Sequence, residues 1–73
     1  MKKYVIIDLT DDAGRNFLMS EEKVAEYAKR FGCRISQCGT MTDAMVFNSE
    51  AEAEVELLKR RINDTTIIPI FKF

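Results

Sequence analysis

Two helix-start signals constrain the fold of this sequence more than any other feature. Ser20 is followed by two glutamates, and a serine N-cap with acids in the first turn is typical of a helix start. Ser49 and Glu52 form the S-x-x-E pattern of a capping box. We therefore predict two helices, over 21–31 and 50–62, within a chain of only 73 residues.

The first predicted helix has one apolar face and a recognisable end. Val24, Ala28 and Phe31 recur at helical spacing, with Tyr27 beside them. Basic residues occupy the last turn, and Gly32 follows at the position where helices often end in a left-handed residue.

The second predicted helix combines an apolar stripe with many charges. The glutamates between positions 50 and 56 are expected to face water, and Glu56 is expected to pair with Arg60 one turn later. The apolar stripe consists of Ala51, Val55, Leu58 and Ile62.

Four segments have the composition of strands. Residues 3–9 are rich in β-branched and aromatic residues and are apolar on both faces, which indicates a central strand. Residues 33–38 alternate but are polar, as is typical of a sheet edge. Residues 43–48 form another apolar strand, and 65–73 form a last strand in which Pro69 favours an edge position.

The order of these segments predicts one α+β domain spanning residues 1–73. We expect a ferredoxin-like βαββαβ sandwich, with a four-stranded antiparallel sheet and two helices on one face. In an alternative arrangement, residues 15–19 form an extra hairpin strand. A chain of this size buries only about 60% of its unfolded surface, so binding to a partner or a second copy would add useful burial.

Composition narrows the function without identifying it. The 11 basic and 12 acidic residues give a net charge of −1, which makes nucleic acid an unlikely partner. The absence of histidine removes the commonest general base and metal ligand, so we expect no cofactor and lean toward a non-enzyme. Cys33 and Cys38 are too far apart on a strand for a disulfide, and two thiols suit the cytoplasm. No segment is long and apolar enough to indicate a membrane protein.

One acidic group supports an alternative, enzymatic function. Asp8, Asp11 and Asp12 follow one another at the end of the first strand and could together bind Mg²⁺. Residues 4–12, with 27–34 and Gln37, resemble the small ferredoxin-fold nuclease-like subunit of CRISPR adaptation and the related virulence-associated D-type toxin ribonucleases. This resemblance implies a homodimer with Asp8 as a catalytic metal-site residue, and hence a metal-dependent ribonuclease or deoxyribonuclease.

The C-terminal half has a different resemblance. Residues 43–54 and 66–70 are similar to short phage and prophage proteins in which a D-A-x-V-F-x-S-x-x-E-A unit precedes a final I-x-P strand. This resemblance implies a mobile-element accessory protein that modulates or inhibits a host protein, such as a defence complex, in the manner of an anti-CRISPR protein.

Our leading hypothesis is therefore a non-catalytic protein-binding module with a host or phage protein as partner and a homodimer as a further possibility. Exposed sheet edges invite addition of a strand from a partner. The expected contact residues lie on the two predicted edge strands: Arg34, Ser36, Gln37, Ile68, Ile70 and Phe71.

Overall fold

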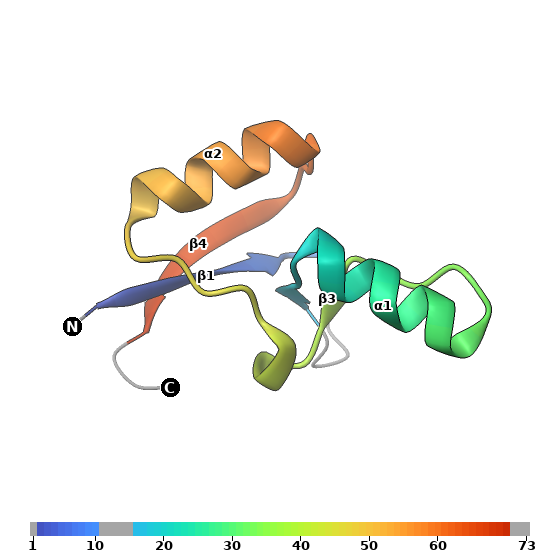
Figure 1. The fold of residues 1–73 in the computed structure, drawn as a ribbon. Helices are drawn as coiled ribbons and strands as arrows, with labels where there is room; N and C mark the ends of the chain where they lie inside the picture. Colours follow the sequence, from blue (N-terminus) through green and yellow to red (C-terminus); the bar gives the residue numbers. More distant parts are fainter. Residues whose placement is uncertain (1, 11–15, 71–73) are drawn as a thin grey trace.

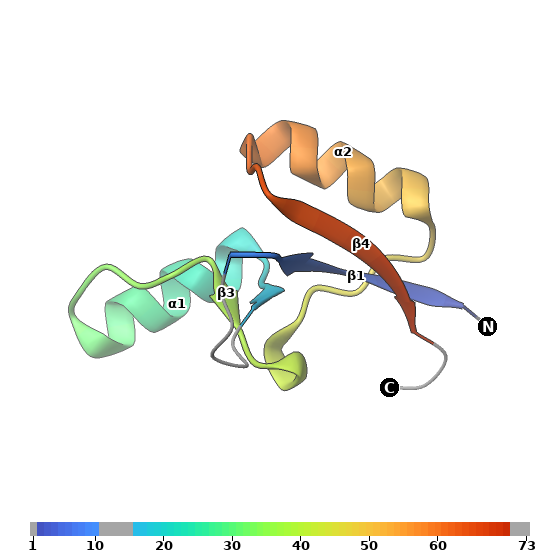
Figure 2. The ribbon, with the colours of Figure 1, turned by 180° about the vertical axis from the view of Figure 1, so that it is seen from behind.

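The fold combines one small antiparallel sheet with two helices of similar length. The computed structural model describes residues 2–10 and 16–70. Along the chain these residues form β1 (Lys3–Asp8), β2 (Phe17–Leu18), α1 (Glu21–Phe31), β3 (Cys38–Gly39), the 3₁₀ turn η1 (Met41–Asp43), α2 (Glu50–Arg60) and β4 (Thr65–Ile70). The strands form one antiparallel sheet in the order β3-β2-β1-β4. Figures 1 and 2 show α2 above β1 and β4, and α1 beside β3.

The predicted fold class is confirmed. The chain is α+β, with a four-stranded antiparallel sheet and two helices, consistent with a βαββαβ-type fold. The extra strand of the alternative is present within 15–19, because Phe17–Leu18 forms β2 and pairs with β1 at Ile7 and Phe17, so the strands and helices follow one another as ββαβαβ. Both helices begin at the predicted serines, since Ser20 Oγ accepts from the Lys23 N–H and Ser49 Oγ accepts from the Glu52 N–H.

The predicted central strand is β1. It pairs with β4 over six residues, from Lys3 opposite Ile70 to Asp8 opposite Thr65. Val5 and Ile6 point to opposite faces of the sheet, and both are completely buried. This burial explains why the segment is apolar on both faces.

The predicted strand at 43–48 is not a strand of the sheet, which corrects that expectation. β2 already pairs with β1 at Ile7, so only the start of β1 remains open on that side. Phe47 forms an isolated bridge there, exchanging two backbone hydrogen bonds with Tyr4 at 2.8 and 2.9 Å. This segment contributes an apolar side chain to the core, because Phe47 is buried there.

The predicted polar strand at 33–38 is also wrong over most of its length. Only Cys38–Gly39 is a strand, and residues 33–37 form an irregular segment after the left-handed Gly32. Gly39 approaches Met19 so closely that a Cβ at position 39 would lie 2.8 Å from the Met19 sulfur. The short strand therefore begins where the chain meets the core. Cys33 and Cys38 are not joined by a disulfide, as expected.

The second helix presents a different face to the sheet from the one that the sequence predicts. Ala53 is completely buried in the core cluster with Ile6, Leu18 and Phe47, and Leu57 packs against it. Val55 and Leu58, two members of the predicted apolar stripe, are 64% and 79% exposed, whereas Ile62, its last member, packs against the core cluster. The small Ala53 allows α2 to lie close to the sheet, and this close approach fixes the rotation of the helix.

Candidate partner-binding site

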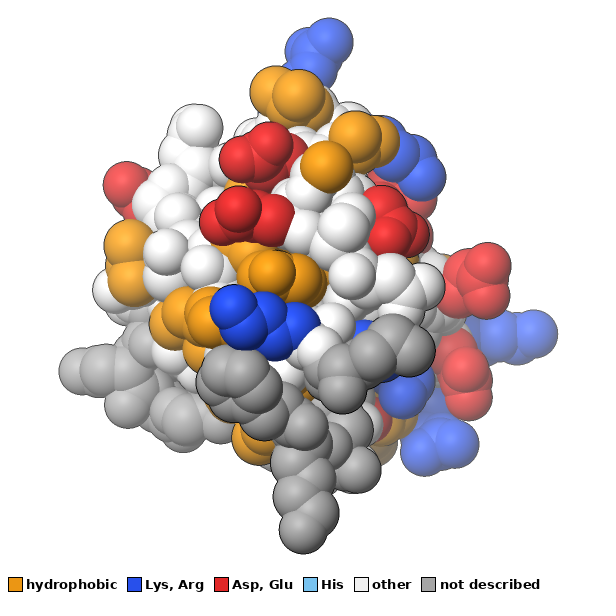
Figure 3. Space-filling model, turned by 90° about the vertical axis from the view of Figure 1, so that its left-hand side faces the viewer, with side chains coloured by type: hydrophobic (Ala, Val, Ile, Leu, Met, Phe, Trp, Pro, Cys, Tyr) orange, Lys and Arg blue, Asp and Glu red, His pale blue; other side chains and the backbone are white. Residues whose placement is uncertain are grey.

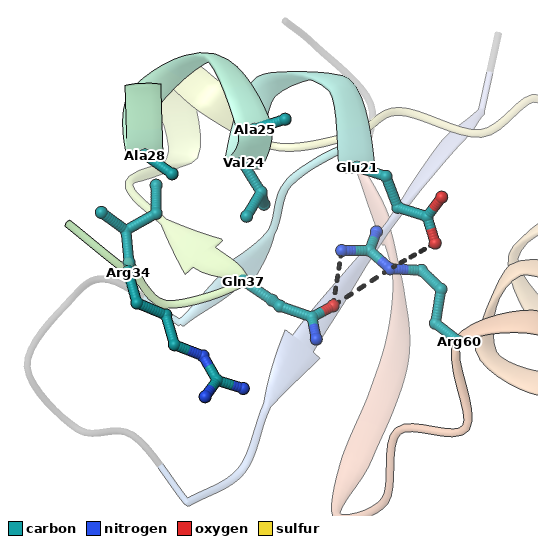
Figure 4. A pocket seen from close by; sticks show the side chains of 8 residues that line it. Glu21, Val24, Ala25, Ala28, Arg34, Gln37 and Arg60 are labelled. Carbon is teal, nitrogen blue, oxygen red and sulfur yellow. Dashed lines mark hydrogen bonds and ion pairs between the residues drawn. The ribbon is translucent and has the colours of Figure 1, made fainter. Parts of the chain in front are cut away.

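An open pocket of about 320 Å³ lies between α1 and the irregular segment that follows it. One wall is apolar, formed by Val24, Ala25 and Ala28 of α1 together with Ile35. Figure 4 shows Val24 and Ala28 directed toward the segment that carries Arg34 and Gln37. The wall therefore contains Val24 and Ala28 of the face of α1 that the sequence predicts to be apolar, but not Tyr27 or Phe31.

The face of α1 is left open because the helix lies beside the sheet. The structure describes α1 along its whole length, and none of its residues is buried. Phe31, at the end of the apolar face, is 64% exposed and contacts only the ring of Tyr27 among aromatic side chains of the described chain, at 6.1 Å between centroids. The amphipathic pattern of α1 is thus only partly satisfied by burial in the described chain, since Val24, Tyr27 and Ala28 are half-buried and Phe31 is exposed.

Polar contacts hold α1 in place. Asp43 of η1 accepts hydrogen bonds from the Tyr27 hydroxyl at 3.1 Å and from Lys23 Nζ at 3.3 Å. At the start of the helix, the Glu21 carboxylate lies 3.9 Å from Nε of Arg60. These contacts fix the position of α1 while leaving its apolar face available.

Arg60 forms the inner, polar end of the pocket. Its side chain is only 2% exposed although it lies in the last turn of a surface helix. The guanidinium donates to Gln37 Oε1 from Nη2 at 2.7 Å and from Nε at 3.2 Å, and also to the Met19 carbonyl. Its charge is balanced by Glu56, at 3.4 Å from Nη1, which confirms the predicted pair of Glu56 with Arg60. Glu56 is therefore largely buried, against the expectation that it faces water.

Arg34 supplies the second cation of the pocket. It is exposed, and in the part of the chain that the structure describes it has no ion-pair or hydrogen-bond partner. In Figure 4 its side chain extends away from α1, so it lies at the rim of the pocket. An unpaired guanidinium at the rim of an apolar pocket can bind a carboxylate by donating two parallel hydrogen bonds to it.

The structure brings together only part of the predicted contact set. Arg34 and Gln37 line the pocket. Ser36 is exposed and its hydroxyl accepts from the Cys38 N–H at 3.1 Å, so it shapes the turn. Ile68 and Ile70 are half-buried in β4, away from this pocket, and Phe71 lies outside the described residues.

The outer edge of β4 offers few backbone donors to a partner strand. The backbone N–H and C=O of Tyr4 both bond to Phe47, on the side of β1 away from β4. Pro69 lies opposite Tyr4 in β4, so its backbone polar group is directed away from β1, toward the outer edge of the sheet. By the same alternation Thr65 and Ile67 also face outward. Because proline has no N–H, two of these three outward positions carry a donor. The outer edge of β4 therefore lacks one of the backbone donors that an added strand would bond to, and proline at an edge is one way in which proteins prevent strand addition.

The proposed metal residues are only partly described. Asp8 Oδ1 accepts from the Thr10 N–H at 2.8 Å and from the Thr10 hydroxyl at 2.6 Å, which forms a local turn. The hydroxyl and then the N–H of Thr10 hold the pKa of the Asp8 carboxyl below its ordinary value of 3.8. Asp11 and Asp12 lie outside the described residues. Within residues 2–10 and 16–70, no three His, Cys, Asp or Glu side chains are grouped to hold a metal ion.

Sequence reasoning missed two kinds of residue at the pocket. Val24 and Ala28 have the pattern of a buried face, and helical periodicity does not distinguish a core from an open groove. Arg60 looks like one member of a basic cluster with its two neighbours, and nothing in the sequence links it to Gln37. The pairing of Glu56 with Arg60 was the only signal that this arginine differs from Arg61.

Comparisons with protein families, with curated proteins and with solved structures find no match for this chain. Among the described residues, no helix is long and apolar enough to cross a membrane.

Proposed function

We propose that this chain is a small non-catalytic protein-binding module that acts in the cytoplasm, and that its contact site is the pocket under α1. The observation that carries the proposal is an amphipathic helix without a buried residue in the described chain, lying over a pocket that contains an unpartnered arginine. A partner that covers this face would complete the burial that the sequence pattern of α1 calls for.

The chemistry of the pocket defines the segment that would fill it. Val24, Ala28 and Ile35 suit a small apolar side chain, and Arg34 suits a carboxylate next to it. Arg60 is already paired with Glu56 and Glu21, so it supports Gln37 rather than adding a second unpaired charge. We therefore propose a protein partner that presents an acidic and a small apolar side chain next to each other.

Phe31 would contribute most of the apolar contact outside the pocket. At 64% exposure it offers about 130 Å² of apolar surface, taking ~200 Å² for a whole phenylalanine side chain. Covering that area is worth about 3 kcal/mol before the costs of association. One aromatic anchor beside an arginine is the composition typical of energetic centres in protein interfaces.

The resemblance of residues 43–54 and 66–70 to short phage proteins supports a host protein as the class of partner. The distribution of charge agrees with this, because the chain has a net charge of −1 and the described pocket has a mixed apolar and polar lining instead of a broad basic face.

Affinity capture with two matched variants tests the proposal. The tagged chain, Arg34→Glu and Lys29→Glu are each incubated with a nuclease-treated lysate of the native cells, and bound proteins are quantified by mass spectrometry. Lys29 is an exposed residue of α1 outside the pocket lining, so its variant carries the same change of charge. We expect a stoichiometric protein that Lys29→Glu retains and Arg34→Glu loses at least ~10-fold. Equal recovery by both variants would contradict the proposed site.

A further inference from the structure

The outer face of α2 carries an apolar stripe that nothing in the described chain covers. Val55 and Leu58 are 64% and 79% exposed, and Ala51 is also exposed. These residues follow the i, i+4, i+7 spacing of one helix face, opposite the buried Ala53. In Figure 3, hydrophobic, acidic and basic side chains reach the surface together at the top of the view, the level that α2 occupies in Figure 1.

The charges beside this stripe are distributed unequally along α2. Glu50, Glu52 and Glu54 lie in its first half, and Lys59 and Arg61 lie at its end. A second α2 packed in parallel would place like charges together. A second α2 packed antiparallel would place the acidic half of each helix beside the basic end of the other.

We propose that the α2 stripe binds the α2 stripe of a second copy of this chain, in an antiparallel arrangement about a two-fold axis. In such an interface each contact occurs twice, so Val55 lies opposite Leu58 of the second copy and Leu58 opposite its Val55. The axis then passes between positions 56 and 57. This register brings Glu54 beside Arg61 of the second copy on one flank of the stripe.

Both flanking charges are available for this contact. In the described chain, Glu54 and Arg61 are exposed and have no ion-pair or hydrogen-bond partner. The stripe is also independent of the proposed pocket, which lies under α1 and receives Arg60 from another face of α2. Self-association through α2 therefore does not depend on the proposed function.

The size of the stripe sets the strength of the dimer. An α-helix of 11 residues is about 16 Å long, so the contact is smaller than a standard protein interface of about 800 Å² per partner. We expect a reversible dimer with a dissociation constant on the order of 10⁻⁴ M.

Sedimentation equilibrium of the full chain between about 0.02 and 1 mM tests this inference over the range around that constant. The average mass is expected to rise from that of the monomer toward that of the dimer as concentration increases. Leu58→Ser should remain monomeric, because it removes a central apolar contact. Leu58 makes little contact within its own chain, so circular dichroism and thermal unfolding should be unchanged in this variant.

Charge reversal tests the register. Glu54→Lys and Arg61→Glu should each weaken self-association roughly 10-fold, because each places like charges side by side twice. An equimolar mixture of the two variants should recover the wild-type dimer, because the heterodimer restores both opposite pairs. Glu26→Lys, an equal change at an exposed α1 residue, is the control and should dimerise normally.

A chain that stays monomeric up to 1 mM would overturn the inference. So would a dimer that Leu58→Ser leaves intact, since another surface would then be responsible. A mixture of Glu54→Lys and Arg61→Glu that stays as weak as either variant alone would overturn the antiparallel register. Loss of a captured foreign protein in Leu58→Ser, with a monomeric wild type, would assign the stripe to that protein instead.

Discussion

Arg60 Nη2 lies 2.7 Å from Oε1 of Gln37, and this contact joins the end of α2 to the segment that follows α1. The same guanidinium also binds the Met19 carbonyl and Glu56. Three separate parts of the chain thus meet at one buried side chain. Their meeting holds the irregular segment 33–37 in place and gives the pocket its inner end.

Replacing Arg60 with alanine should destabilise the whole domain. The change leaves Glu56 without its cation in a largely buried position and removes the hydrogen bonds to Gln37 and Met19. We expect a loss of about 2–4 kcal/mol in the free energy of unfolding. Urea denaturation measures it, with Arg61→Ala as the matched control that should change stability by less than ~0.5 kcal/mol. Equal losses of stability in both variants would contradict the conclusion that the Arg60 guanidinium holds these three parts of the chain together.

Two substitutions of alanine by leucine, on opposite faces of α2, test the rotation of this helix. Ala53 is completely buried against the sheet and Ala51 is exposed. Ala53→Leu should therefore overpack the core and cost about 1–3 kcal/mol, whereas Ala51→Leu should be within ~0.5 kcal/mol of wild type. Thermal or urea unfolding of the two variants is the measurement. The reverse order would mean that the face predicted from the sequence is the buried one.

Phe31 and Phe47 should respond in opposite ways to truncation. Phe47 is 6% exposed in the core, so Phe47→Ala is expected to cost about 3–5 kcal/mol. Phe31→Ala should leave stability nearly unchanged, because that side chain is mostly in water. We also expect Phe31→Ala to weaken binding of the captured partner. Strong destabilisation by Phe31→Ala would show that the α1 face is covered by the chain itself.

The turn at Asp8 should make stability depend on pH. Hydrogen bonds from Thr10 lower the carboxyl pKa in the folded chain relative to the unfolded chain. The folded state therefore gains stability above the unfolded pKa and loses it as the pH falls through the lower, folded pKa. Asp8→Asn keeps an oxygen acceptor and removes the charge, so it should cost roughly 0.5 kcal/mol at pH 7 and nothing at about pH 2. Unfolding of both proteins at the two pH values measures this difference, and a deficit that persists at low pH would contradict the assignment.

Local sequence signals predicted the parts of this fold that depend on local physics. The serine caps, the left-handed Gly32 and the pair of Glu56 with Arg60 each involve residues close together in the chain. The central position of β1 was predictable because the strand is apolar on both faces. Periodicity was less informative about which apolar face is buried. Both faces of α2 carry apolar residues, and the small size of Ala53 decided between them through a tertiary contact.

The candidate site could be predicted only in fragments for a similar reason. Arg34 and Gln37 were expected to contact a partner, but as members of an edge strand. In the structure they lie on an irregular segment because Gly32 turns the chain and Arg60 holds Gln37 from 23 residues away. No pattern within 33–38 signals that contact. The pocket therefore emerges from the packing of α1, the segment 33–37 and the end of α2.

Hydrogen exchange of the chain, alone and bound to its captured partner, tests whether the partner binds the pocket under α1. We expect new protection in residues 21–37, which include α1 and the segment lining the pocket, with little change in the outward positions of β4. Protection confined to residues 65–70, with α1 and 33–37 unchanged, would contradict the pocket as the binding site and would favour addition of a partner strand at the edge of β4.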